Sequence, residues 1–223
     1  MCGRFDRHSE LDAFAELIEG LVLDSDPGLP PSYNIAPSQS ALVVALGADG
    51  APQAKALEWG LLPGWVSKPG MNRPINARLE SVAEKPMFRN AFKKRRCVVL
   101  CDGYYEWQGK GSGKQPYYFC AEENRPFVLA GLWESNSRLT EQRVQSFCVV
   151  TRSANDAVSE VHHRMPLVPD YGYVQDWLNP NTAPEALLER GSSMSISDLK
   201  FYPVSTYVNR PSNNGPECAQ ALT

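Results

Sequence analysis

Short apolar or alternating runs follow one another along this chain from Ala41 onward. Each has the length of a strand, and clusters of Gly, Pro and Asn separate them; they span residues 41–46, 97–101, 116–120, 127–132 and 147–151. Helical patterns of crossover length do not alternate regularly with these runs, which disfavours a doubly wound α/β sheet. The pattern predicts an α+β fold whose core is a mostly antiparallel system of strands.

Helical periodicity is confined to a few segments. Ser9 and Asp12 resemble a capping box, and the apolar residues behind them recur at helical spacing, which predicts a helix over 9–23. Further helices are expected at 85–94, at 154–160 with Ser153 as N-cap, at 170–178, and at 183–190 with Gly191 as the C-terminal stop. These helices are expected to flank the strands.

We expect a single domain over residues 1–223. A chain of 223 residues with 43% hydrophobic residues is long enough to bury a substantial core. Residues 211–223 are polar and are expected to form a loosely held tail. Because neither a secretory signal nor an apolar run of about 18 residues is found, we expect a cytoplasmic protein.

The six cysteines are interpreted as thiols in such a compartment. Cys97 and Cys101 lie four residues apart and should share one face of a strand, while Cys120 and Cys148 lie in apolar, strand-like runs. A zinc site would need short paired spacings that the sequence lacks. We therefore expect neither a metal nor a cofactor.

Nucleic-acid binding, if present, must come from a local patch, because the net charge of −3 gives the whole protein no reason to bind polyanions. Basic and aromatic residues are interleaved over 85–96, and Trp65 lies in a loop framed by Gly and Pro. Such groups could line a groove and stack on unpaired bases. A basic run is, however, most often a solvated helix face.

Cys2 becomes the first residue if Met1 is removed, and it then carries both a thiol and a free α-amine. Their ordinary pKa values of about 8.5 and about 7.7–8.0 leave part of each group nucleophilic near neutrality. The amine forms a reversible imine with an aldehyde, and the neighbouring thiol can close this imine into a durable thiazolidine ring. A cysteine buried for packing alone is the alternative.

Three further segments carry groups suited to catalysis. Asn76 and Arg78 lie two apart in an extended segment and should point the same way, one suited to orienting an amine and the other to a phosphate. Glu106 lies between aromatic residues, where poor solvation should raise the pKa of its carboxyl group. An ordinary polar turn and a surface glutamate on an alternating strand are the structural alternatives.

A pair of histidines, His162 and His163, is followed by Arg164. Histidine is the side chain best suited to acid–base work near neutrality, and arginine can bind a phosphate. The pair could also ligate a metal, but the sequence offers no third and fourth ligand at suitable spacing.

Eight ordered motifs together resemble the SRAP family of abasic-site processing proteins, first named as SOS-response-associated peptidases. They are MCGRF, YNIAP (33–37), WGLLPGW (59–65), INARLES (75–81), MF (87–88), DGYYEW (102–107), HHRMP (162–166) and YPVS (202–205). The resemblance extends from residue 2 to about residue 209 and implies the family's fold, an α+β domain with a barrel-like β core. Where some members carry a second tryptophan after Pro-Gly, this chain has Val66.

The resemblance also implies a function and a set of roles. The family's pattern implies that Met1 is removed, an autoproteolytic removal being possible, so that Cys2 becomes the N-terminal residue. Cys2 would then crosslink to the aldehyde of an abasic site in single-stranded DNA. Asn76 would position the terminus, Glu106 would serve its amine as acid–base group, and His162, preferred to His163, would assist ring opening and reversal. The implied DNA contacts are Arg4, Asn34, Trp65, Arg78, Met87, Phe88, Thr151, Arg164 and Ser205.

Two other functions compete with this interpretation. A class II glutamine amidotransferase also begins Met-Cys-Gly and uses the cysteine thiol on an amide, but it gives no role to the Glu106 and His162 motifs. A non-catalytic single-strand binding module would use the basic and aromatic surface alone. For the favoured function we expect a monomer that associates with the nucleoid when bound to DNA, with single-strand/double-strand junctions as further candidate sites.

Overall fold

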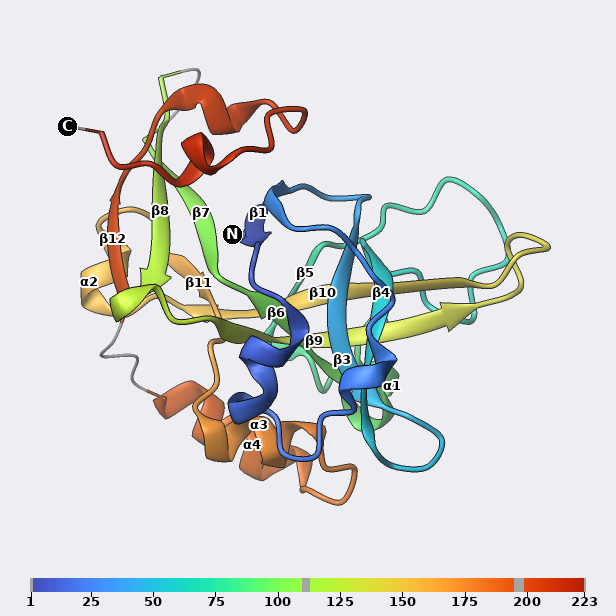
Figure 1. The fold of residues 1–223 in the computed structure, drawn as a ribbon. Helices are drawn as coiled ribbons and strands as arrows, with labels where there is room; N and C mark the ends of the chain where they lie inside the picture. The colour runs from blue at the N-terminus through green and yellow to red at the C-terminus, as the bar shows by residue number, and fades with distance from the viewer. Residues whose placement is uncertain (1, 110–112, 195–198, 223) are drawn as a thin grey trace.

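The computed structural model describes residues 2–109, 113–194 and 199–222, and its core consists of two β-sheets (Figure 1). The smaller sheet has five antiparallel strands in the order β12-β8-β7-β1-β2. These strands are β1 (Arg4–Arg7), β2 (Ser32–Ile35), β7 (Gly103–Gln108), β8 (Gln115–Ala121) and β12 (Leu199–Pro203). Strand β1, which directly follows Cys2, therefore lies between β2 and β7.

The larger sheet closes on itself. Its strands are β3 (Ser40–Leu46), β4 (Pro52–Trp59), β5 (Asn76–Arg78), β6 (Arg96–Cys101), β9 (Phe127–Asn136), β10 (Val144–Ser153) and β11 (Arg164–Pro166). β10 pairs with β4 at one side and with β9 at the other, and β4, β3, β6 and β9 pair in that order. The resulting ring of strands confirms the barrel-like α+β core.

Alternation along the barrel strands divides the interior into two apolar clusters. In β3, Ala41, Val43 and Ala45 pack in the cluster that includes Phe5, Tyr104 and Phe119 of the smaller sheet. Leu42 and Val44 pack in the other cluster, together with residues of helices α1 (Arg89–Lys94), α3 (Tyr171–Leu178) and α4 (Pro184–Ser193). The strand period of two thus separates the contacts to the second sheet from the contacts to the helices.

Three of the expected helices have different ends in the structure, and α1 begins at Arg89 where a start at 85 was expected. α2 (Asp156–Ser159) is capped by Asn155, whose side chain accepts from the Val158 amide, and not by Ser153. α4 passes Gly191 and ends at Ser193. A Cβ at Gly191 would lie 2.6 Å from the Tyr173 hydroxyl oxygen, so this glycine serves close packing and does not stop the helix.

The predicted helix over 9–23 is wrong. The segment forms two short 3-10 helices, η1 (Leu11–Leu17) and η2 (Leu23–Ser25), separated by Gly20 with φ +74°. Ser9 does not cap a helix, because its hydroxyl donates to the Asp102 carboxylate at 2.5 Å. Tertiary contacts have therefore replaced the capping box that the local sequence resembles.

The last residues, which we expected to be loosely held, pack against β2 in the structure. Asn34 of β2 donates to the backbone carbonyls of Val208, Arg210 and Asn213, and Cys218 in η6 (Pro216–Ala219) is fully buried. The remaining short 3-10 helices are η3 (Leu79–Ser81), η4 (Glu122–Asn124) and η5 (Thr206–Asn209). Within the described residues, no helix has the length and apolar character needed to cross a membrane.

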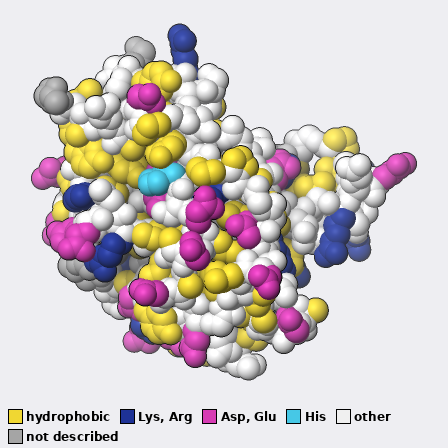
Figure 2. All heavy atoms as spheres, in the orientation of Figure 1, with side chains coloured by type: hydrophobic (Ala, Val, Ile, Leu, Met, Phe, Trp, Pro, Cys, Tyr) yellow, Lys and Arg dark blue, Asp and Glu magenta, His cyan; other side chains and the backbone are white. Residues whose placement is uncertain are grey.

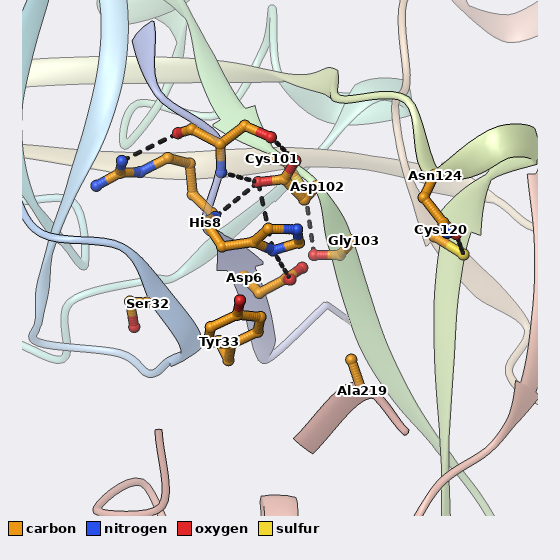
Figure 3. Close-up of polar contacts among 12 residues, drawn as sticks. Asp6, His8, Ser32, Tyr33, Cys101, Asp102, Gly103, Cys120, Asn124 and Ala219 are labelled. Carbon is orange, nitrogen blue, oxygen red and sulfur yellow. Dashed lines mark hydrogen bonds and ion pairs between the residues drawn. The ribbon is translucent and has the colours of Figure 1, made fainter. Parts of the chain in front are cut away.

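Buried carboxylates anchor the end of β1 that lies away from Cys2 (Figure 3). The His8 ring lies over Tyr33 and contacts Asp6 at 2.9 Å, and the backbone amides of His8 and Ser9 donate to Asp102. The Tyr118 hydroxyl donates to Asp6 as well. Burial raises the pKa of Asp6 to about 7, with the His8 hydrogen bond acting against the rise.

Candidate active site at the amino terminus

Cys2 is fully buried at the start of β1, within the apolar cluster that also contains Phe5 and Trp59. Its sulfur lies 3.8 Å from the Arg4 carbonyl oxygen. Burial raises the pKa of the Cys2 thiol well above its ordinary value, and the negative charge of Glu106 raises it further. The thiol is therefore protonated near neutrality, and it needs a base before it can act as a nucleophile.

Asn76 holds the backbone of Cys2. Its Nδ2 donates to the Cys2 carbonyl oxygen at 2.8 Å, and its position is fixed because β5 pairs in parallel with β10, with Asn76 opposite Val149. The buried Oδ1 of Asn76 has no hydrogen-bond partner among the described residues. This oxygen can accept from an amine at position 2, as the role predicted from the sequence requires.

Glu106 lies beside the first residues of β1 because β7 and β1 are antiparallel, with Tyr105 opposite Arg4 and Tyr104 opposite Phe5. The side chain is buried, and burial raises the pKa of its carboxyl group to about 7, while the positive charge at the amino terminus acts against the rise. A carboxyl group with such a pKa can both accept and donate a proton near neutral pH. The poor solvation expected from the sequence is thus present.

His162 lies in the loop between α2 and β11, and its ring stacks on that of His163 at 4.4 Å between centroids. His162 Nδ1 lies 3.0 Å from the Arg164 backbone nitrogen and 3.2 Å from the Arg164 carbonyl oxygen, so the neighbouring backbone holds the ring in place. Burial, followed by the positive charge at the amino terminus, lowers the pKa of His162. His163 is the more exposed of the pair.

A lysine that the sequence interpretation missed links these two groups. Burial is the main cause of both pKa shifts, and the positive charge of Lys114 acts on both groups as well. It opposes the rise in the pKa of Glu106 and adds to the fall in the pKa of His162. Lys114 is exposed and directly precedes β8, after a glycine-rich connection that offered no signal of its proximity to either motif. Figure 2 shows histidine side chains among hydrophobic ones, close to the position of the N-terminus in Figure 1.

The structure brings some of the expected DNA contacts to the surface. Arg78 is exposed on β5, two residues from Asn76, and the Trp65 side chain is 51% exposed. Met87 is partly buried and packs against the core, whereas Phe88 belongs to the core itself. A cleft of about 600 Å³ adjoins Asn76 and is lined by Pro37, Ser38, Trp59, Gly60 and residues 71–76.

Other expected contacts are engaged within the protein. Arg164 is buried and forms a bidentate ion pair with Glu80. It also donates to the Thr151 carbonyl oxygen. Thr151 is fully buried, with its hydroxyl 3.4 Å from the Ala77 carbonyl oxygen. The sequence interpretation missed Glu80, because nothing in the local sequence links it to an arginine 84 residues away.

Arg4, Asn34 and Ser205 also have partners in the structure. The Arg4 guanidinium donates to Asn34 Oδ1 at 2.7 Å and lies over the Trp107 ring. Ser205 caps η5 by accepting from the Tyr207 amide. These residues hold the C-terminal segment beside β1 and β2, so a role in binding DNA would have to be added to this structural one.

The chain is similar to known proteins over nearly all of its length. The family model described as SOS response associated peptidase (SRAP) matches residues 1–211. Abasic site processing protein YoaM of Bacillus subtilis (strain 168) is 34% identical, over 99% of this chain and 98% of its own length. Abasic site processing protein YedK of Escherichia coli (strain K12) is 28% identical over the full length of both chains.

A longer relative and two crystal structures extend the likeness. Abasic site processing protein HMCES of Xenopus tropicalis is 33% identical, over 89% of this chain and 68% of its own. A protein from Bacteroides thetaiotaomicron has a TM-score of 0.84 at 22% identity over the full length of both chains. A phage-related protein from Bordetella bronchiseptica has a TM-score of 0.72 at 27% identity, covering 91% of this chain and 94% of its own. The match of the family model to residues 1–211 and the likeness to these relatives show that this chain belongs to the SRAP family.

Proposed function

We propose that this protein captures the aldehyde of an abasic site in single-stranded DNA as a covalent thiazolidine at Cys2, and so shields the lesion during repair. The observation that carries the proposal is the hydrogen bond from Asn76 to the Cys2 carbonyl oxygen, which fixes this residue beside the buried Glu106. The names of the relatives YoaM and YedK as abasic site processing proteins support the same substrate.

The chemistry begins with the removal of Met1, in which hydrolysis of one peptide bond consumes a water molecule and leaves the α-amine on Cys2. Glu106, with its raised pKa, is placed to serve as base in this step and to take a proton from the amine. The cleavage can therefore be autoproteolytic. Without it the nitrogen of Cys2 remains an amide, which is not a nucleophile.

The crosslink then forms in two steps. The amine of Cys2 adds to the aldehyde carbon, and loss of one water gives an imine. The thiol adds across the imine: its sulfur bonds to the former aldehyde carbon while its proton passes to nitrogen, which closes the five-membered ring. This order suits a buried thiol with a raised pKa, because the amine reacts first and the thiol needs only a proton transfer within the site.

His162 serves the sugar. Abasic deoxyribose is mainly a closed hemiacetal, so proton transfer at the ring oxygen must precede attack by the amine. In the tautomer in which the Arg164 amide donates to Nδ1, the neutral ring of His162 carries its proton on Nε2 and can donate it to that oxygen. By microscopic reversibility the same proton transfers accompany the return to free aldehyde, so the crosslink is reversible.

The exposed Arg78 and Trp65 are the proposed first contacts with DNA. An arginine two residues from Asn76 can pair with a phosphate next to the lesion, and an exposed indole can stack on a neighbouring base. Single-stranded DNA is the proposed substrate, with junctions as further candidates, and the protein is proposed to act as a monomer and to join the nucleoid when bound.

The test is to incubate the purified protein with an oligonucleotide that bears one abasic site and to look for a heat-stable species of higher mass. The wild type should form it and Cys2→Ala should not, because an amine alone gives an imine that heating reverses. Glutaminase activity without an adduct would favour an amidotransferase. DNA binding that survives Cys2→Ala, without any adduct in the wild type, would favour a simple binding module.

A further inference from the structure

Trp65 is an exposed side chain on a segment that is otherwise packed into the protein. Its indole is 51% exposed, whereas its neighbours Leu62, Pro63 and Val66 are buried. The segment lies between β4 and β5 and runs beside the long β9–β10 hairpin, with which it forms the arm at the right of Figure 1. An exposed indole on a backbone segment that is held in place is suited to stacking on an unpaired base.

Asn136 joins this segment to the hairpin. It lies at the end of β9, 1% exposed, and its Nδ2 donates to the carbonyl oxygens of Pro63 at 2.7 Å and Val66 at 2.8 Å. Its Oδ1 accepts from the backbone amides of Arg138 and Leu139, each at 2.9 Å. All four hydrogen-bonding positions of the amide are therefore used, and the two donor bonds end on either side of Trp65.

Two further contacts hold the same segment. The Leu62 amide donates to Ser146 Oγ of β10 at 2.8 Å. A Cβ at Gly64 would lie 2.8 Å from the Ser135 carbonyl oxygen, so only glycine allows the segment to approach β9 so closely. These contacts on the buried side of the segment all lead to the β9–β10 hairpin, while the Trp65 side chain is 51% exposed.

We propose that Asn136 is a positioning residue for DNA: it fixes the segment so that Trp65 is ready to stack on an unpaired base of the bound strand. The inference rests on the proposed function. An aromatic side chain that is already ordered loses little conformational entropy on binding, so the stacking energy goes mainly into affinity. Asn136 acts only through Trp65 and takes no part in the chemistry at Cys2.

Asn136→Asp is the sharpest variant, because the aspartate has the same shape and still accepts from Arg138 and Leu139 but cannot donate to the segment. Without DNA, hydrogen exchange at the amides of residues 62–66 should accelerate at least tenfold relative to wild type. Gln175→Ala is the matched control, since Gln175 also bridges two carbonyl oxygens, those of Leu17 and Tyr171, but at α3. The control should leave exchange at 62–66 unchanged.

Crosslinking kinetics give the second readout. Asn136→Asp should raise the DNA concentration needed for the half-maximal rate by about tenfold, a typical effect of losing one stacked base, and should leave the rate at saturation unchanged. Asn136→Asp combined with Trp65→Ala should be no worse than Trp65→Ala alone, since both changes remove the same interaction. Additive effects, or a lower saturating rate for Asn136→Asp, would overturn the proposal.

The two proposals fail differently. If the wild type forms no adduct, the proposed function is wrong, and the exchange measurement still decides whether Asn136 holds the Trp65 segment. If the wild type crosslinks but exchange at 62–66 is the same in Asn136→Asp and wild type, the positioning role is wrong and the function stands. Should Asn136→Asp fail to fold, Ser146→Ala removes a hydrogen bond to the same segment from β10. This variant must also raise the DNA concentration needed for the half-maximal rate and leave the rate at saturation unchanged.

Discussion

At the scale of single residues, the site separates two acid–base groups by moving their pKa values in opposite directions. Burial raises the pKa of Glu106 to about 7, whereas burial and nearby positive charge lower the pKa of His162. At neutral pH Glu106 can therefore exchange a proton with an amine while His162 stays neutral. In the proposed mechanism, Glu106 serves the amine of Cys2 and His162 serves the sugar.

Glu106→Gln tests the first assignment. A base must be ionised, and the raised pKa of Glu106 means that its ionised fraction grows as pH rises through about 7. Wild-type crosslink formation should accelerate over that range, and Glu106→Gln should lose the acceleration and fall by about 10²- to 10⁴-fold. Rates measured on a fixed abasic oligonucleotide between pH 5.5 and 8.5 decide it. A variant that keeps the wild-type pH profile would exclude Glu106 as the base.

His162→Ala should slow both formation and reversal of the crosslink, by microscopic reversibility, and should give the same final adduct. His163→Ala, which removes the more exposed ring of the stacked pair, is the matched control and should stay close to wild type. Transfer from a labelled to an excess of unlabelled oligonucleotide measures reversal. A slow His163→Ala beside a normal His162→Ala would assign the role to the other histidine.

Residue types could mark candidates for the site, but the family resemblance was needed to assign their roles. A thiol beside a terminus, an amide, and a carboxyl group among aromatic residues each suggest a chemical role, which made Cys2, Asn76 and Glu106 candidates. The structure places Asn76 and Glu106 beside Cys2. Arg164 was harder to interpret. An arginine looks the same in the sequence whether it meets a phosphate or a distant carboxylate, and here Glu80 is the carboxylate it meets.

At the scale of elements, β5 and β11 flank the same stretch of β10 and present two arginines in different ways. Arg78 lies opposite Thr151, and Arg164 lies opposite Ser153. Arg78 is exposed, while the Arg164 guanidinium is occupied by Glu80. Their positions in the sheet are close, but only Arg78 offers its charge to a ligand without first breaking an ion pair.

The salt dependence of DNA binding separates the two arginines. Arg78→Ala should reduce the slope of log affinity against log salt by about 0.7, the increment for one phosphate on a single strand. Arg164→Ala should leave this slope unchanged and lower the free energy of unfolding, because it leaves the Thr151 carbonyl and Glu80 without their partner. An equal loss of slope in both variants would show that Arg164 also binds a DNA phosphate.

Strands were predicted better than helices at this scale, for a physical reason. The apolar runs at 41–46 and 97–101 are buried on both faces, so their composition alone identifies them as strands β3 and β6. The segment 9–23 has helical spacing, yet Ser9 and Arg7 make hydrogen bonds to distant parts of the chain and Gly20 takes a positive φ. Local periodicity carries no information about such tertiary partners.

At the scale of the whole molecule, β1 connects the reactive end of the chain to a buried polar cluster. Cys2 precedes the strand, and Asp6 and His8 lie at its far end, where Asp102 accepts from the His8 amide (Figure 3). The Tyr118 hydroxyl also donates to Asp6. A Cβ at Gly103 would collide with the Tyr118 ring, so this glycine allows the tyrosine to cover β7 and reach Asp6. Both ends of β1 are thus fixed between its neighbouring strands.

This cluster should make the protein less stable as pH rises. The pKa of Asp6 is about 7 in the folded state against 3.8 ordinarily, so the folded protein holds a proton that the unfolded chain releases between these values. The raised pKa of His8 acts in the same direction. The free energy of unfolding of wild type, relative to Asp6→Asn, should therefore fall from pH 4 to pH 7, by up to about 1.4 kcal/mol per pH unit.

Denaturant unfolding at a series of pH values checks this prediction, with Asp12→Asn, a change at an exposed carboxylate, as the control. The control should show no such trend. A difference between wild type and Asp6→Asn that stays constant or grows with pH would show that the carboxyl group is ionised throughout.

The central claim is that Cys2, freed of Met1, bonds to the abasic aldehyde through both its nitrogen and its sulfur. Intact mass measurement of the heat-treated adduct tests it most directly. The account predicts a mass equal to the protein without Met1 plus the abasic oligonucleotide less one water, and loss of this species in Cys2→Ala. A heat-stable adduct that retains Met1, or one that persists in Cys2→Ala, would contradict the mechanism.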